Sequence, residues 1–256
     1  MKLSDATYPE IEKLLAGDTP VVAILPVGAT EAHGPHLPLA TDVLISEGFA
    51  RVACDKLNAD ARMNAILLPS IAYTPADYAG SFAGTVSISP ELLEQLITEI
   101  ASNLKRQGFA CLALANSHFD PMNVAALRNA ARKIPEAIGL PVAFADATRR
   151  ALAAQLNEEF QSGDCHAGEF ETSIVLAERP ELVRKPLADA LPAREVHLIE
   201  TIQSLGASAN FESAGMDQAY CGAPAKASRE SGEKSIEILA HALFTSVENS
   251  LFSTGQ

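Results

Sequence analysis

The sequence predicts an α/β fold with a mostly parallel central sheet, and it predicts that residues 1–256 form a single domain. Two observations support this expectation. Short apolar runs typical of buried strands alternate along the chain with longer segments of helical periodicity. The run at residues 109–115 is apolar throughout, which indicates a central strand that is covered on both faces.

The elements follow from periodicity and from start and stop signals. Ser89 and Pro90 provide the N-cap and first residue of a helix, and Gly108 ends it. The expected elements are helix 5–16, strand 21–25, helix 42–59, strand 65–69, helix 90–107, strand 109–115, helix 122–133, strand 141–145 and a last helix at 231–250. Residues 73–85, rich in Gly, Ser, Pro and Tyr, are expected to be a loop that walls a substrate site.

Composition excludes several classes of function. The net charge of −13 makes a nucleic acid or an anionic membrane an unexpected partner. We find no signal-like segment and no apolar run long enough to span a bilayer, so a cytoplasmic location is expected. The four cysteines lack Cys-x-x-Cys spacing and are expected to be reduced. A Cys165–His166 nucleophilic pair is not favoured, because adjacent side chains in an extended segment face apart.

Residues 26–42, PVGATEAHGPHLPLATD, follow the first predicted strand and concentrate metal-binding side chains. Glu31 and His33 have i, i+2 spacing, which lets both reach one ion from extended backbone. Asp42 is either a bridging ligand or an N-cap of the next helix. His36 is either a further ligand or a loop histidine bonded to backbone.

The strand at 109–115 is followed by His118 and Asp120, again at i, i+2 spacing. Asp120 precedes Pro121 and therefore fits either a metal ligand or a helix N-cap. Phe119 between them is expected to supply an apolar wall. Ligands bind at the carboxyl ends of strands in a parallel sheet, which is where both motifs lie.

Residues 164–173, DCHAGEFETS, form a third motif. A helix beginning near Ala167 would place Glu169 and Glu171 at its positive end, where carboxylates are stabilised with or without a catalytic role. The segment 81–87, which contains Ser81, fits a turn that leads into an edge strand.

The 26–42 segment resembles the signature of the creatininase (creatinine amidohydrolase) family, and residues 166–173 are similar to its His-Ala-Gly-Glu-x-Glu-Thr-Ser segment. The resemblance extends over most of the chain. It implies a three-layer α/β/α sandwich and a binuclear centre of zinc or manganese. The family hydrolyses cyclic amides and, in some members, formamides or peptides.

The resemblance implies the roles of individual residues. The five expected metal ligands are Glu31, His33, Asp42, His118 and Asp120. They are too many for one tetrahedral ion with an open position. The resemblance places Glu31 and His118 on one ion, His33 and Asp120 on the other, and Asp42 with a hydroxide between them. It makes His166 the proton-transfer residue, supported by Glu171. Weaker candidates for substrate contact are Ser81, Phe119, His36 and Glu169.

The expected reaction is hydrolysis of a C–N bond in a small cyclic amide or formamide by a metal-bridging hydroxide. Creatinine itself is not expected, because the family's substrate-covering tryptophans have no counterpart in a chain without tryptophan. Two alternatives stay open: ring opening of a keto-sugar or inosose by the same metals, and a non-catalytic metal-binding scaffold. The expected partners are a small-molecule substrate and further copies of the chain, with a hexamer implied by the resemblance.

Overall fold

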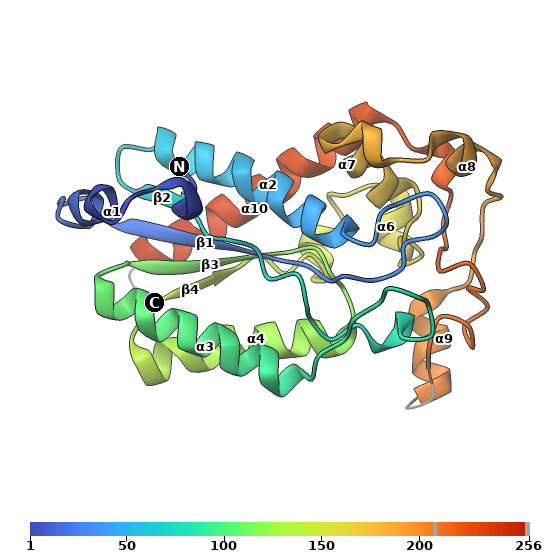
Figure 1. The fold of residues 1–256 in the computed structure, drawn as a ribbon, viewed down its shortest axis with the longest axis horizontal. Coiled ribbons are helices and arrows are strands. Elements are labelled where there is room, and N and C mark those ends of the chain that lie inside the picture. The colour runs from blue at the N-terminus through green and yellow to red at the C-terminus, as the bar shows by residue number, and fades with distance from the viewer. Residues whose placement is uncertain (207–208, 254–256) are drawn as a thin grey trace.

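A parallel sheet forms the middle layer of the molecule (Figure 1). The computed structural model describes residues 1–206 and 209–253. Within them the sheet has four strands in the order β2-β1-β3-β4. The strands are β1 (Val21–Val27), β2 (Asn64–Leu67), β3 (Cys111–Asn116) and β4 (Val142–Phe144). The predicted parallel sheet is therefore confirmed.

Helices cover both faces of the sheet and complete three layers (Figure 1). One face carries α2 (Thr41–Ala59), α7 (Glu169–Glu178) and α10 (Arg229–Phe252). The other carries α3 (Pro90–Gln107) and α4 (Pro121–Ile138). The smaller helices are α1 (Tyr8–Leu15), α5 (Arg150–Ala153), α6 (Glu158–Ser162), α8 (Lys185–Ala190) and α9 (Leu198–Leu205). None of the described helices combines the length and apolar character needed to cross a bilayer.

The core explains why the central strands are apolar throughout. Successive side chains of a strand point to opposite faces of the sheet. Val22 and Ile24 of β1 pack into the core under α2, α7 and α10, whereas Val21, Ala23 and Leu25 pack into the core over α3 and α4. Burial on both faces is what a parallel sheet between two helical layers requires.

The long elements lie close to their predicted positions. Ser89 caps α3 by accepting a hydrogen bond from the Leu92 amide at 3.3 Å, and Gly108 ends that helix with a φ of 99°. Val86 forms an isolated antiparallel bridge with Thr30. The helices α5, α6, α8 and α9 were not predicted. The first three have only four to six residues, which is too short to show helical periodicity.

The helical layer formed by α2, α7 and α10 depends on a close approach between α10 and α7. A Cβ at Gly232 of α10 would lie 2.0 Å from the backbone oxygen of Ser173 in α7. The Ser228 amide, just before α10, also donates to Ser173 Oγ at 3.1 Å. The missing side chain at residue 232 therefore sets how closely α10 packs on α7.

We predict that Gly232→Ala forces α10 away from α7 and lowers the free energy of unfolding by about 1–3 kcal/mol. The control is Gly17→Ala at an exposed position, where the added methyl would make only an ordinary contact of 3.5 Å with Leu14 O. Urea denaturation of both variants measures the difference. Equal stability of the two variants would contradict the close approach.

Candidate metal centre

The three sequence motifs converge at the carboxyl edge of the sheet. Val27 at the end of β1 is in register with Asn116 at the end of β3, so the two loops that follow leave the sheet side by side. The loop after β1 carries Glu31 and His33, and the loop after β3 carries His118. Asp42 lies in the first turn of α2.

Two groups of potential ligand atoms share one carboxylate. The first group is Glu31, Asp42 and His118, and the second is His33, Asp42 and Glu171. Within each group the ligand atoms lie within 4.8 Å of one another. All five residues are buried. A third group of the same kind joins His166 to Glu31 and His33.

Asp42 lies between the two groups and directs one oxygen to each. Its Oδ1 is 3.2 Å from His33 Nε2, and its Oδ2 is 3.0 Å from His118 Nδ1. His33 Nε2 is also 3.4 Å from Glu171 Oε2, while His118 Nδ1 is 3.3 Å from Glu31 Oε1. A carboxylate in this position can bridge two cations.

The other ring nitrogen of each imidazole is held by a backbone carbonyl. His33 Nδ1 lies 3.2 Å from the backbone carbonyl oxygen of Glu31, and His118 Nε2 lies 2.7 Å from that of Pro75. His166 Nε2 lies 2.9 Å from the Ala32 oxygen. A carbonyl only accepts, so these nitrogens carry the protons. A neutral ring then directs a lone pair toward the carboxylates, as metal-binding histidines do.

Electrostatics shows that the cluster needs positive charge. Burial disfavours a charged His33, but Asp42, Glu171 and Glu31 outweigh burial and raise the pKa of His33 to about 10. Burial likewise opposes a charge on His118, yet Glu31 and Asp42 raise its pKa well above the ordinary value. Three buried carboxylates therefore require either protonated imidazoles or bound cations.

Burial and neighbouring charges also compete in setting the pKa values of Glu171 and His166. Burial raises the pKa of Glu171 to about 8, although His33 opposes the rise. Burial and the nearby His33 lower the pKa of His166 to about 4, so this ring is neutral near pH 7. A neutral His166 with its Nε2 proton on Ala32 has a free lone pair at Nδ1, which lies 3.8 Å from Glu31 Oε1.

The donor set fits a divalent metal ion. His33 Nε2 is buried and makes no hydrogen bond, although it faces three carboxylates. An imidazole nitrogen in that position is satisfied by a cation placed between it and the oxygens. Imidazole and carboxylate ligands suit zinc, and manganese favours the oxygen-rich part of the set.

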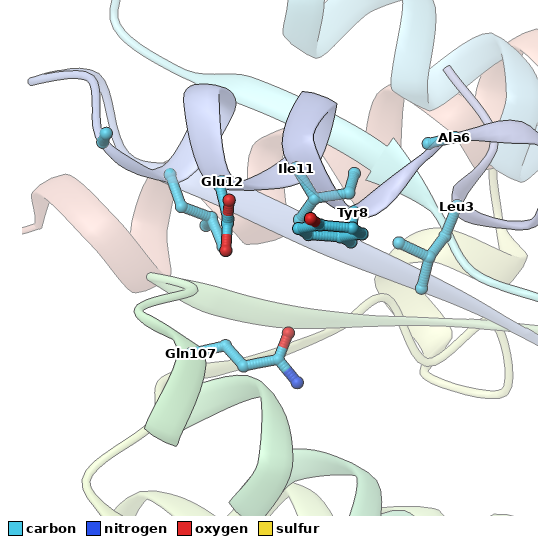
Figure 2. Close-up of a pocket in the computed structure, with 8 residues that line it drawn as sticks. Leu3, Ala6, Tyr8, Ile11, Glu12 and Gln107 are labelled. Atoms are coloured by element: carbon cyan, nitrogen blue, oxygen red, sulfur yellow. The ribbon is translucent and has the colours of Figure 1, made fainter.

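The groove drawn in Figure 2 lies away from these ligand groups. The groove drawn there, of about 630 Å³, lies beside α1 and the end of α3, near the amino ends of β1 and β3. Glu12 is the one carboxylate among its lining residues, and no histidine lines it. The metal-binding side chains therefore place the candidate site at the opposite edge of the sheet.

Comparison with known proteins agrees with this geometry. Residues 4–247 match the family described as "Creatininase: Creatinine amidohydrolase". The chain belongs to the creatininase family. It is 33% identical over 199 residues to the mycofactocin precursor peptide peptidase of Mycobacterium ulcerans, covering 72% of each chain. It is 30% identical over 199 residues to the creatinine amidohydrolase of Pseudomonas putida, covering 71% of this chain and 73% of the relative.

A solved creatininase shows the same fold. Its crystal structure superimposes with a TM-score of 0.73 at 24% identity and covers 98% of both chains. The three-layer α/β/α architecture that the creatininase resemblance implied is thereby confirmed.

The geometry divides the ligands differently from the creatininase pattern applied to the sequence. That pattern placed Asp120 with His33, whereas the structure places Glu171 with His33. Asp120 Oδ1 instead accepts a hydrogen bond from the Met122 amide at 2.7 Å and caps α4. The short Asp120 side chain is thus used to cap the helix. Burial raises its pKa above the ordinary value, the charge of His118 opposes this rise, and the charge of Glu31 adds to it. The role of Asp120 as a ligand stays a prediction.

The weaker candidates occupy varied positions. His36 is buried and belongs to neither of the two ligand groups, and its Nε2 lies 2.9 Å from Thr172 Oγ1. Burial and the charge of His33 lower the pKa of His36 to about 4. Glu169 is the half-buried first residue of α7. Phe119 packs edge-on against Phe160, with 5.3 Å between the ring centroids.

Phe211 contacts the centre and escaped the sequence interpretation, whereas Thr85 lies in the segment 81–87 that the sequence had singled out. Phe211 packs on His166 with ring centroids 4.4 Å apart, and its amide donates to the Tyr78 carbonyl at 2.8 Å. It lies outside every motif, so the sequence carried no signal for it. Thr85 Oγ1 accepts from the Ala32 amide at 3.1 Å and so belongs to the ligand loop, whereas Ser81 in the same segment is exposed.

We predict that Thr172→Val lowers the free energy of unfolding by about 1–3 kcal/mol, because it leaves the buried Nε2 of His36 without its partner. His36 Nδ1 already lacks one. Thr98→Val is the control, since that half-buried hydroxyl bonds only to the carbonyl of Glu94 in its own helix. Urea denaturation compares the two variants. Equal losses of stability in the two variants would show that the contact between Thr172 and His36 does not stabilise the fold.

Proposed function

We propose that this protein is a binuclear metal-dependent hydrolase that cleaves the C–N bond of an amide. The observation that carries the proposal is the position of Asp42, whose two oxygens face two imidazole nitrogens. Each of these imidazoles is anchored to a backbone carbonyl through its other nitrogen.

We assign one ion to Glu31, Asp42 and His118, and the other to His33, Asp42 and Glu171. The ions proposed are zinc, manganese or one of each. Related creatininase structures that are described as a manganese form and a Zn–Zn form support this choice. Asp120 is kept as an additional ligand in the proposal, acting through the oxygen that does not cap α4.

When bound, such ions polarise an amide carbonyl and lower the pKa of water enough to supply a nucleophile near pH 7. The protein's own residues handle the proton. His166 is neutral, and its Nδ1 faces the cluster. It can therefore accept a proton at Nδ1 and deliver it to the leaving nitrogen. The Ala32 carbonyl holds the ring in the required tautomer.

Two classes of amide are candidates for the substrate. The first is the small cyclic amide or formamide expected from the sequence, and the creatinine amidohydrolase relative supports it. The second is a peptide bond, which the relatives named mycofactocin precursor peptide peptidase favour at 31–33% identity over 72% of this chain. The absence of tryptophan continues to argue against creatinine itself.

The other expectations stay predictions. Ring opening of an inosose-type ketone would use the same cations, and a non-catalytic scaffold would need no neutral His166. The retention of that histidine beside the full ligand set favours an enzyme. The single-domain organisation and the homo-oligomer, a hexamer by resemblance, are likewise proposed.

We predict that the purified protein binds about two equivalents of zinc or manganese per chain, and that Asp42→Ala retains one or none, because both ions share this carboxylate. Elemental analysis after reconstitution measures the content. Asp77→Ala is the control and should retain both ions, because Asp77 is exposed, begins a short 3-10 helix and belongs to none of the ligand groups. The helix-cap alternative for Asp42 is wrong, because Ala40 is the N-cap of α2 and no side chain caps it. A single ion that survives in Asp42→Ala would therefore contradict the shared carboxylate.

We predict that the loaded protein hydrolyses members of one amide class, to an acid and an amine or to a ring-opened acid, and that His166→Gln lowers kcat by about 10²–10⁴-fold while both ions stay bound. The assay compares hydantoins and dihydropyrimidines, formamides, and short peptides in parallel. Unchanged turnover in His166→Gln would remove this residue from the mechanism. Turnover of an inosose but of no amide would favour the ring-opening alternative.

A further inference from the structure

A carboxylate outside the metal centre joins two segments that flank it. Glu159 belongs to α6, which lies beside α7 (Figure 1). Its Oε1 accepts a hydrogen bond from the Phe170 amide at 2.9 Å, and its Oε2 accepts one from the Ala223 amide at 2.6 Å. Phe170 lies in the first turn of α7, and Ala223 lies in the loop before α10.

Two glycines leave the space that this carboxylate fills. A Cβ at Gly168 would lie 2.3 Å from Glu159 Oε1, and a Cβ at Gly222 would lie 2.3 Å from Glu159 Oε2. Any side chain at either glycine would displace the carboxylate. The three residues thus form one packing unit, although they come from separate parts of the chain.

The unit completes a helix start that lacks a cap of its own. The N-cap position of α7 is Gly168, which has no side chain to accept a hydrogen bond. The first amides of a helix have no partner within the helix and carry partial positive charge. The carboxylate of Glu159 supplies both an acceptor and the matching negative charge from outside the helix.

The same helix start presents a proposed metal ligand. Glu171 follows Phe170 directly, its Oε2 accepts from the Ala167 amide at 2.6 Å, and that oxygen lies 3.4 Å from His33 Nε2. On the other side, the Cys221 amide donates to the His166 carbonyl at 2.9 Å. Glu159 therefore ties the segment bearing His166 and Glu171 to the loop that supports it.

We propose that Glu159 is a positioning residue for the metal ion held by His33, Asp42 and Glu171. It fixes the first turn of α7, and through it the carboxylate of Glu171, without touching the ion. This inference rests on the proposed two-ion centre. It concerns one ion only, because the group of Glu31, Asp42 and His118 has no member on α7.

The test is a calorimetric titration of metal-stripped protein with zinc or manganese. Wild type should show two binding steps. Glu159→Gln places an amide N–H group against a backbone N–H donor, and we expect it to weaken one step by about 10–100-fold while the other is unchanged. Glu158→Gln is the matched control, since Glu158 is the exposed neighbour in the same helix.

A second variant reaches the same carboxylate from the other side. Gly168→Ala keeps Glu159 but displaces it, and the φ of −86° at this residue suits alanine. We expect the same step to weaken, and the double variant with Glu159→Gln to lose less than the sum of the two effects. Thermal unfolding of the metal-free proteins shows that each variant is folded.

The outcomes separate the two proposals. Fewer than two ions in wild type would overturn the two-ion centre and this inference with it. Two ions in wild type, with both steps unchanged in Glu159→Gln and Gly168→Ala, would overturn the role of Glu159 alone. Equal weakening of both steps would show a general structural role and would also contradict the inference.

Discussion

The attraction between buried carboxylates and cations governs the carboxyl edge of this sheet. Glu31, Asp42 and Glu171 lie together out of water, and each is near an imidazole nitrogen. Uncompensated negative charges at such a depth would strongly oppose folding. Divalent cations bound as proposed would offset these charges and would leave His33 and His118 neutral. The free energy cost of the uncompensated carboxylates would then favour metal binding.

The scaffold brings these groups together from separate parts of the chain. The parallel register of β1 and β3 sets two ligand loops side by side, and α2 starts from the first of them. Glu171 is contributed by α7, and the close contact at Gly232 and the carboxylate of Glu159 hold this helix in place. Substitutions in this packing around α7 are therefore expected to alter one of the two proposed ion sites more than the other.

The sequence predicted the long elements and most of the cluster, because apolar periodicity and i, i+2 spacing are local properties. Glu31, His33, Asp42 and His118 could be assigned on that basis together with the family resemblance. The pairing of His33 with Glu171 could not, since it depends on where α7 docks. Short-range signals likewise left Asp120 ambiguous between ligand and cap, and tertiary geometry resolves only its capping role.

The most direct test is anomalous diffraction from crystals of the manganese-loaded protein. We expect two peaks, one on each side of Asp42, with Glu31 and His118 around the first and His33 and Glu171 around the second. A single peak would contradict the bridged centre. Two peaks with Asp120 in place of Glu171 beside His33 would contradict the assignment of ligands and the proposed role of α7.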